Sequence, residues 1–214
     1  MIGTVTGILL AAGQARRFGA NKLLALLADG RPVGQATADT LAGEVDRMVV
    51  VVGETDDRTA ELFETAGYAT VRCSDAALGM AHSLRCGVAA TRESGAWLVM
   101  LADMPAVQAA TLREIVARVR RGAQLVVPRH AGRDGHPVAF AAAFRAELEA
   151  LTGDRGARPV LDRHAAAALY LDVDDPGVLL DIDTPADLAR VGLDDRKGSK
   201  AGSKGSDTIA RPRK

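Results

Sequence analysis

Short apolar runs alternate with longer amphipathic stretches along most of the chain. The apolar runs are rich in β-branched residues, and we expect strands over 5–10, 47–52, 69–72, 97–101 and 124–128. Between them, apolar residues recur at i, i+3 and i+4, which predicts helices over 58–66, 81–91 and 109–119. Strands that are apolar on both faces and separated by helices indicate a mostly parallel sheet between two helical layers. The predicted fold class is therefore α/β, a three-layer Rossmann-like arrangement.

The pattern changes near residue 130. Residues 124–140 form two extended segments around Asp134 and Gly135, a dipeptide that favours a tight turn, so we expect a β-hairpin inserted into the α/β alternation. A short helix over 141–151 and a strand over 170–173 should follow. Near the end of the chain, Thr184 is a candidate N-cap, with Pro185 as the first residue of the last helix.

Composition and charge narrow the class of protein. The chain has 27 basic and 27 acidic residues, but residues 193–214 hold seven of the basic and only three of the acidic ones. This Gly/Ser/Lys-rich segment cannot bury enough apolar surface to order itself, so we expect a single domain over 1–192 and a disordered basic tail over 193–214. The remaining mild negative charge and the aromatic content of 3% argue against a nucleic-acid ligand.

The sequence gives no sign of a membrane or secreted protein. No apolar run reaches the ~18 residues that a membrane span requires, and no basic region precedes the first apolar stretch. Cys73 and Cys86 do not make a disulfide scaffold or a zinc site, and we expect Cys86 to pack as a small apolar residue in a helix. We therefore expect a cytoplasmic protein.

The loop after the first strand is the first candidate site. Ala11, Ala12 and Gly13 are small enough for the backbone to approach a ligand closely, and consecutive free N–H groups in such a turn bind anions. Arg17 and Lys22 add positive charge, which suits a triphosphate. The alternative is an ordinary glycine-containing loop with basic surface residues.

Aspartates form the second and third candidates. Asp103 directly follows an apolar strand, where ligands of α/β sheets bind, and a carboxylate there can hold Mg²⁺. Asp181 and Asp183 lie on one face of an extended segment, and either can complete a metal site with Asp103. For each aspartate the alternative is a helix cap.

Two further segments carry polar groups that suit a ligand. Gly79 ends a loop and Ser83 lies in the first turn of the next helix, where N–H groups and the hydroxyl can contact a nucleobase or phosphate. His136, followed by Pro137, begins the second arm of the expected hairpin and can face an acceptor substrate. Helix capping and a surface histidine are the respective alternatives.

Together these segments resemble the molybdenum cofactor nucleotidyltransferases, a branch of the GT-A-like NTP transferases. The family signature Leu-Ala-Ala-Gly-x-x-x-Arg-Phe/Met-Gly-x-x-Lys is matched at every fixed position, from Leu10 to Lys22. LADMPAV, GHPVAF, GDRGARPVL and DIDTPADL follow in the family's order, and the likeness covers residues 4–192. GMAHSLRCGV is similar to the cytidylyltransferase branch, in which Gly-Met-x-x-Ser-Leu stands at this place.

The resemblance implies transfer of CMP from CTP to the phosphate of a molybdopterin-type cofactor, with release of pyrophosphate. It implies that Arg17 and Lys22 bind the triphosphate, that Asp103 and Asp183 hold Mg²⁺, and that His136 and Pro137 contact the acceptor. The nucleotide would be framed by a further set of residues: Leu10, Ala11, Ala12, Gly13, Gly79 and Ser83. A molybdenum hydroxylase, such as a xanthine dehydrogenase-type enzyme, would be the partner.

Two alternatives remain open at this point. One is a guanylyltransferase or another NTP transferase that acts on a different phosphorylated acceptor. The other is a non-catalytic protein that binds or delivers the molybdenum cofactor. The presence of Arg17, Lys22 and Asp103 together argues against a non-catalytic protein.

Overall fold

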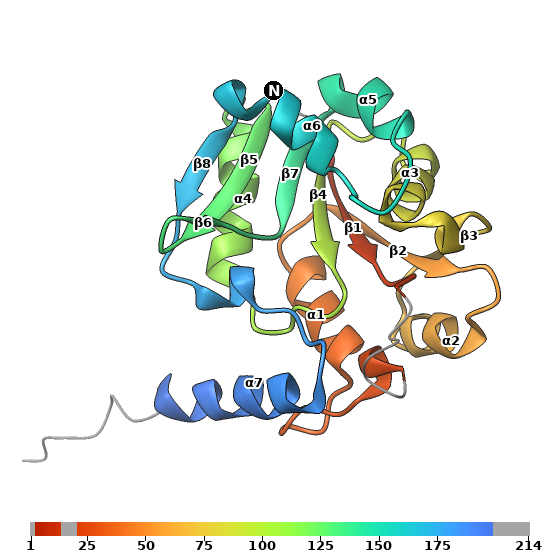
Figure 1. Cartoon of the computed structure of the whole chain (residues 1–214), viewed down its shortest axis with the longest axis vertical. Coiled ribbons are helices and arrows are strands. Elements are labelled where there is room, and N and C mark those ends of the chain that lie inside the picture. Colours follow the sequence, from red (N-terminus) through yellow and green to blue (C-terminus); the bar gives the residue numbers. More distant parts are fainter. Residues whose placement is uncertain (1–2, 14–20, 199–214) are drawn as a thin grey trace, which may run out of the picture.

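The computed structural model describes residues 3–13 and 21–198, and the side chains of that range through Val191. A mixed sheet with the order β3-β2-β1-β4-β7-β5-β6 forms its centre, and β8 adds to β5 (Figure 1). The strands are β1 (Val5–Leu10), β2 (Arg47–Gly53), β3 (Thr70–Cys73), β4 (Ala96–Leu101), β5 (Leu125–His130), β6 (Arg133–Asp134), β7 (Val138–Ala141) and β8 (Leu169–Asp172). The predicted α/β class with a mostly parallel sheet is confirmed.

Helices cover both faces of the sheet (Figure 1). One face packs against α1 (Val33–Ala42), α2 (Asp57–Thr65) and α4 (Ala109–Arg120). The other face packs against α3 (Met80–Ala90), α5 (Arg145–Glu149) and α6 (Arg158–Arg163). The last helix, α7 (Pro185–Gly198), extends along one end of the molecule.

The central strands are buried on both sides because their apolar residues face two separate cores. In β4, Leu98 and Met100 belong to the α1/α2/α4 core, whereas Trp97 and Val99 belong to the α3/α5/α6 core. The indole N–H of Trp97 donates to the Thr91 hydroxyl at 2.9 Å, so the largest buried side chain has its polar atom satisfied. The strand and helix positions expected from the apolar pattern agree closely with β1 to β4 and with α2 and α3, whereas α1 was not expected.

The inserted hairpin differs from the expectation. β5 and β6 are joined at Ala131 and Gly132, which both have positive φ, and not at Asp134 and Gly135. Gly135 has a different role, because a Cβ there would come within 2.5 Å of the Val178 carbonyl oxygen. β7 then returns antiparallel between β4 and β5.

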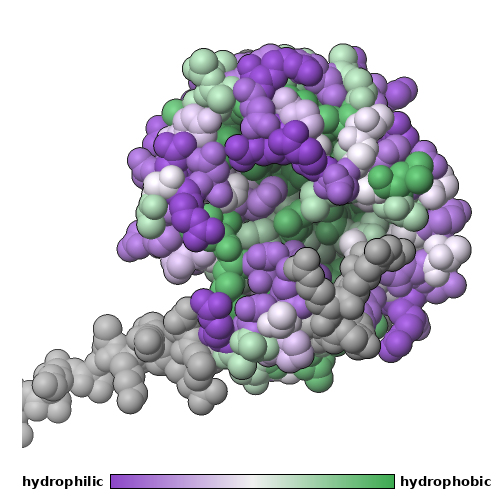
Figure 2. Space-filling view, viewed as in Figure 1, coloured by the Kyte–Doolittle hydropathy of each residue, from purple (hydrophilic) through white to green (hydrophobic). Residues whose placement is uncertain are grey.

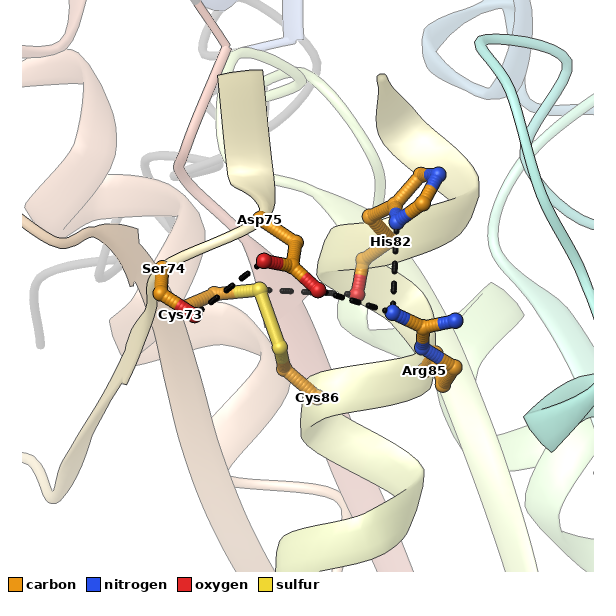
Figure 3. The surroundings of a disulfide bond; sticks show 6 residues. All are labelled: Cys73, Ser74, Asp75, His82, Arg85 and Cys86. Carbon is orange, nitrogen blue, oxygen red and sulfur yellow. Dashed lines mark hydrogen bonds and ion pairs between the residues drawn. A yellow bond between two sulfur atoms is a disulfide. The ribbon is translucent and has the colours of Figure 1, made fainter. Parts of the chain in front are cut away.

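The cysteines also differ from the expectation. Cys86 does not pack as a small apolar residue; it forms a disulfide with Cys73, which joins α3 to the end of β3 (Figure 3). Sequence spacing gave no indication of this pair, because a disulfide requires that β3 and α3 lie side by side in the folded chain.

The C-terminal segment is helical for longer than expected. Thr184 caps α7 as predicted, and its hydroxyl and N–H both contact the Asp187 carboxylate. The helix continues through Gly198, so residues 193–198 of the expected tail are helical, and residues 199–214 lie outside the described part. Among the described residues, we find no helix of the length and hydropathy that crossing a membrane requires.

Candidate functional site

The loop after β1 and the aspartate after β4 lie at the same edge of the sheet. Leu10 pairs with Leu101, and the N–H of Ala102 donates to the Leu10 carbonyl at 3.1 Å. Because both strands run in the same direction, Gly13 and Asp103 leave the sheet side by side. This is the edge at which ligands bind in open parallel sheets.

A cavity of about 320 Å³ opens at this edge. Its wall contains Leu10, Ala12, Gly13, Ala76, Ala77, Gly79, Met80, Ser83, Leu101, Asp103 and Asp154. Six of the residues named from the sequence therefore share one cavity, whereas Ala11 is buried and is not among the lining residues. Figure 2 shows this face of the molecule, with a hollow whose floor is apolar and whose rim is hydrophilic.

The wall opposite the β1 loop is formed by the start of α3. Gly79 has a φ of +126°, and a Cβ there would lie 2.4 Å from the Gly153 carbonyl oxygen. That same oxygen accepts a hydrogen bond from the N–H of Ala81 at 3.1 Å. Glycine is therefore required at this position, and the segment around Gly153 holds the start of α3 in place.

Lys22 does not line the cavity itself but pairs with Asp103, which does. It begins a short 3₁₀ turn that Asn21 caps through its side chain. Its Nζ lies 2.7 Å from Asp103 Oδ2 and 2.8 Å from Asp183 Oδ1. Burial lowers the pKa of this ammonium group, but the hydrogen bonds to the two carboxylates outweigh burial and raise the pKa overall. Lys22 is therefore charged at neutral pH.

Three carboxylates converge beside Lys22. One oxygen each from Asp103, Asp181 and Asp183 lies within 4.8 Å of the others. The backbone keeps them together, because the N–H of Ile182 donates to the Asp103 carbonyl at 2.9 Å. Asp103 Oδ1 is buried and has no hydrogen-bond partner among the described residues. A hard divalent cation satisfies an orphaned carboxylate oxygen of this kind, so the residues fit Mg²⁺ or Mn²⁺.

A second cavity, of about 120 Å³, lies next to the first and shares Leu10, Met80 and Leu101 with it. His136 lines this second cavity, and Pro137 is buried without lining it. The His136 backbone is fixed by a 2.9 Å hydrogen bond to the Val178 carbonyl.

The His136 ring is held neutral in this position. Its Nδ1 is buried and has no partner among the described residues. Burial lowers the pKa of the ring, and the negative charges of Asp103 and Asp181 only partly oppose this. A neutral imidazole with a free ring nitrogen suits hydrogen bonding to a ligand more than holding an anion.

Two arginines that the sequence analysis did not name stand at the second cavity. Arg155 and Arg158 line it, and both bind the Asp162 carboxylate, at 3.1 and 2.7 Å. Their signal in the sequence was the segment GDRGARPVL, which carried no expected site residue of its own. Asp181 was weighed only as an alternative to Asp183, and the structure places it in the same cluster. Arg17 lies outside the described residues.

The arrangement suits chemistry on a polyphosphate. Two anionic phosphates can be brought together by three features of the site: a carboxylate cluster for a divalent cation, a lysine beside that cluster and a cavity walled by backbone groups. Charge neutralisation and positioning are the main sources of catalysis in such reactions.

Comparisons with known proteins agree with this geometry. The family described as "MobA-like NTP transferase domain" matches residues 7–168. The chain is 32% identical to "Purine catabolism protein PucB" of Bacillus subtilis, over 86% of this chain and 94% of that one. It is 30% identical to "Nicotine blue oxidoreductase" of Paenarthrobacter nicotinovorans, over 87% and 96% of the two chains.

Among solved structures, the Mycobacterium tuberculosis protein Rv0371c, in a structure titled as a complex with manganese, has 29% identity and a TM-score of 0.71. The match covers 89% of this chain and 99% of that chain. From the matched family model and the shared fold, the chain belongs to the MobA-like NTP transferase domain family and is a nucleotidyltransferase.

Proposed function

We propose that the protein transfers CMP from CTP to the phosphate of a molybdopterin-type cofactor and releases pyrophosphate, with Mg²⁺ as the cofactor. One observation supports this most directly: the Gly13 loop, the start of α3 and the Asp103 carboxylate border a single cavity. A nucleotide in that cavity has its phosphates beside the carboxylate cluster and Lys22.

The chain's own residues bind the nucleotide, neutralise the charge of its phosphates and orient it for attack. Backbone groups at Ala12, Gly13 and Gly79 line the space for base and ribose. Lys22, with Arg17 of the same signature, neutralises the triphosphate and the leaving pyrophosphate. Asp103 and Asp183, with Asp181 beside them, hold a divalent cation that offsets negative charge on the phosphate oxygens when bound. The acceptor phosphate is already ionised at neutral pH, so an oxygen of it attacks the α-phosphorus without a general base.

The choice of CTP rests on the α3 wall. Gly79, Met80 and Ser83 line the cavity. They belong to the segment GMAHSLRCGV, which resembles the cytidylyltransferase branch. Ser83 is buried in that wall and offers a hydroxyl to the bound nucleotide.

The acceptor belongs in the second cavity. Apolar residues line it together with His136, Arg155 and Arg158, which suits a flat nitrogen heterocycle that carries phosphate. Leu10, Met80 and Leu101 line both cavities, so a phosphate bound in the second cavity would lie near a nucleotide in the first. Binding there would free Arg155 and Arg158 from Asp162, and His136 would offer its ring nitrogen to the heterocycle.

The product would pass to a molybdenum hydroxylase in the cytoplasm. One relative is named a purine catabolism protein, and xanthine is a purine, which favours a xanthine dehydrogenase-type enzyme as the recipient. A binding measurement with the purified hydroxylase tests this partner.

The experiment that tests the proposal compares CTP, GTP, ATP and UTP, each with Mg²⁺, by thermal shift and then by pyrophosphate release with the molybdopterin cofactor. Ligands that bind the native state raise the melting temperature by mass action. We expect CTP to give the largest shift and the fastest cofactor-dependent release. A preference for GTP would make the protein a guanylyltransferase. Cofactor binding without pyrophosphate release from any nucleotide would make it a delivery protein.

A further inference from the structure

A disulfide closes the α3 wall of the nucleotide cavity. It joins Cys73, the last residue of β3, to Cys86 in the middle of α3, with their Cα atoms 5.9 Å apart (Figure 3). Cys73 is only 1% exposed, whereas Cys86 is half-buried and is the more exposed residue of the pair. Neither cysteine lines the cavity itself.

The segment between the two cysteines supplies much of the cavity wall. Five lining residues lie inside the loop that the disulfide closes: Ala76, Ala77, Gly79, Met80 and Ser83. The Asp103 and Gly13 side of the cavity lies outside this loop. The disulfide therefore acts on one wall and leaves the carboxylate cluster untouched.

Packing alone holds this segment weakly. No residue from Ser74 to Met80 is buried, and Leu78 and Met80 are 63% and 40% exposed. Figure 3 shows the polar contacts around the disulfide: Asp75 binds Arg85 at 3.0 Å, and Arg85 lies 3.3 Å from His82 Nδ1. Partly exposed contacts of this kind contribute little to stability. The disulfide is therefore the strongest constraint on residues 74–80 besides the contact of Gly79 with Gly153.

We propose that the Cys73–Cys86 disulfide is a redox-sensitive site that sets nucleotide affinity through the position of the α3 wall. The inference rests on the proposed function, since it takes the cavity to be the nucleotide site. In the oxidised protein the wall is ordered before the nucleotide arrives, so binding does not bear the cost of ordering it. In the reduced protein the loop from Ser74 to Gly79 has more freedom, and the nucleotide must order it.

The reductant is a dithiol or a pair of small thiols. A thiolate of the reductant attacks Cys86 Sγ, a mixed disulfide forms, and the bond to Cys73 breaks to leave a Cys73 thiolate that takes a proton. The second thiol then attacks the mixed disulfide, which releases Cys86 as a thiol and leaves the reductant as a disulfide. Two electrons and two protons pass from the reductant to the protein. In a reducing compartment a disulfide of this kind is typically transient and redox-sensing.

The experiment compares the full chain after air oxidation and after treatment with excess dithiothreitol. Maleimide labelling of the unfolded protein, read by mass, counts the free thiols in each sample. CTP affinity is measured with Mg²⁺ by calorimetry, and amide hydrogen exchange is followed over residues 74–83. We expect no labelled thiol and slow exchange in the oxidised form. In the reduced form we expect two labelled thiols, faster exchange and a CTP Kd raised about fivefold or more.

The matched control is Cys73→Ala/Cys86→Ala, which should give the reduced-form Kd and no response to dithiothreitol. The comparison of oxidised with reduced wild-type protein tests the proposal even if this variant does not fold. Two labelled thiols in the air-oxidised protein, or equal exchange rates in the two forms, would overturn the proposal. So would equal CTP affinity alongside different exchange rates. Different exchange rates with no CTP bound in either form would instead refute the assignment of CTP to this cavity and leave the redox-sensitive segment standing.

Discussion

The two walls of the main cavity are fixed in different ways. On one side, Gly13 and Asp103 leave adjacent strands of the sheet, and Lys22 is tied to the carboxylates by two ion pairs. On the other side, an exposed loop is fixed by a disulfide and by a glycine pressed against Gly153. The charged wall is held by the sheet, so changes there should affect chemistry. The α3 wall is held by local contacts, so changes there should affect binding and stability.

The largest effect should come from the charged wall. Asp103→Ala removes an anchor for the divalent cation, and we expect kcat to fall by at least ~10³-fold, because the charge that a metal neutralises is worth several kcal/mol. Melting temperature should stay close to that of the wild type. Pyrophosphate release and circular dichroism are the measurements.

Asp174→Ala is the control for Asp103→Ala, since Asp174 is an exposed aspartate outside both cavities. It should leave kcat unchanged. Normal pyrophosphate release by Asp103→Ala would show that the carboxylate cluster is not the reaction centre.

Lys22→Ala should have the next largest effect. We expect a loss of about 2.7 kcal/mol of transition-state stabilisation, close to 100-fold in kcat/KM, as for removal of one preorganised charge contact. Its ammonium also competes with a cation for Asp103 and Asp183. Mn²⁺ should therefore bind the variant more tightly than the wild type when no nucleotide is present, as electron paramagnetic resonance would show.

Lys22→Arg separates charge from shape at the same position. It keeps the positive charge and should recover part of the lost kcat/KM and weaken Mn²⁺ binding toward the wild-type value. Equal Mn²⁺ affinity in wild type and Lys22→Ala would contradict the competition.

The sequence pointed to residues of both walls, Gly13 and Asp103 on one side and Gly79 and Ser83 on the other, but not to the contacts that fix the α3 wall. β1 begins and ends at the expected residues, and Asp103 directly follows an apolar strand, because parallel strands place their site residues at their carboxyl ends. By contrast, the pairing of Cys73 with Cys86 depends on the docking of α3 beside β3, which no local pattern encodes.

Other differences have similar physical causes. No helix was expected over Val33–Ala42, because its buried face is made of small residues such as Gly34, Ala36 and Ala38, which give little apolar contrast. Asp134-Gly135 has the composition of a turn, but its glycine serves a close approach to Val178. Local composition thus predicted most of the regular elements, and failed where small residues or a tertiary contact decide the structure.

A test of the α3 wall uses two glycines with positive φ. Alanine at Gly79 meets the Gly153 carbonyl oxygen, whereas at Gly67 nothing lies within 4 Å of an added Cβ. We expect Gly79→Ala to lower the free energy of unfolding by about 2 kcal/mol or more, and Gly67→Ala by about 1 kcal/mol from backbone strain alone.

Chemical denaturation and CTP binding measure the two glycine variants. Only Gly79→Ala should weaken CTP binding, because Gly67 does not line the cavity. If both variants lost equal stability and bound CTP equally well, the contact with Gly153 would not fix this wall.

The smallest effect concerns His136, which lines the second cavity. Burial lowers the pKa of its ring in the folded protein, so in the pH range below the ordinary value of about 6.5 the unfolded chain binds the proton more readily than the folded one. The stability that His136 contributes is therefore complete above about pH 6.5 and is lost as pH falls toward the folded pKa.

His136→Gln is neutral throughout and should show a flatter decline in unfolding free energy between about pH 7.5 and 5.5. His82, His130 and His164 are present in both proteins, so the difference between the two pH profiles reports on His136. Parallel pH profiles for wild type and variant would show that the ring titrates alike in both states, and would remove the neutral imidazole from the acceptor cavity.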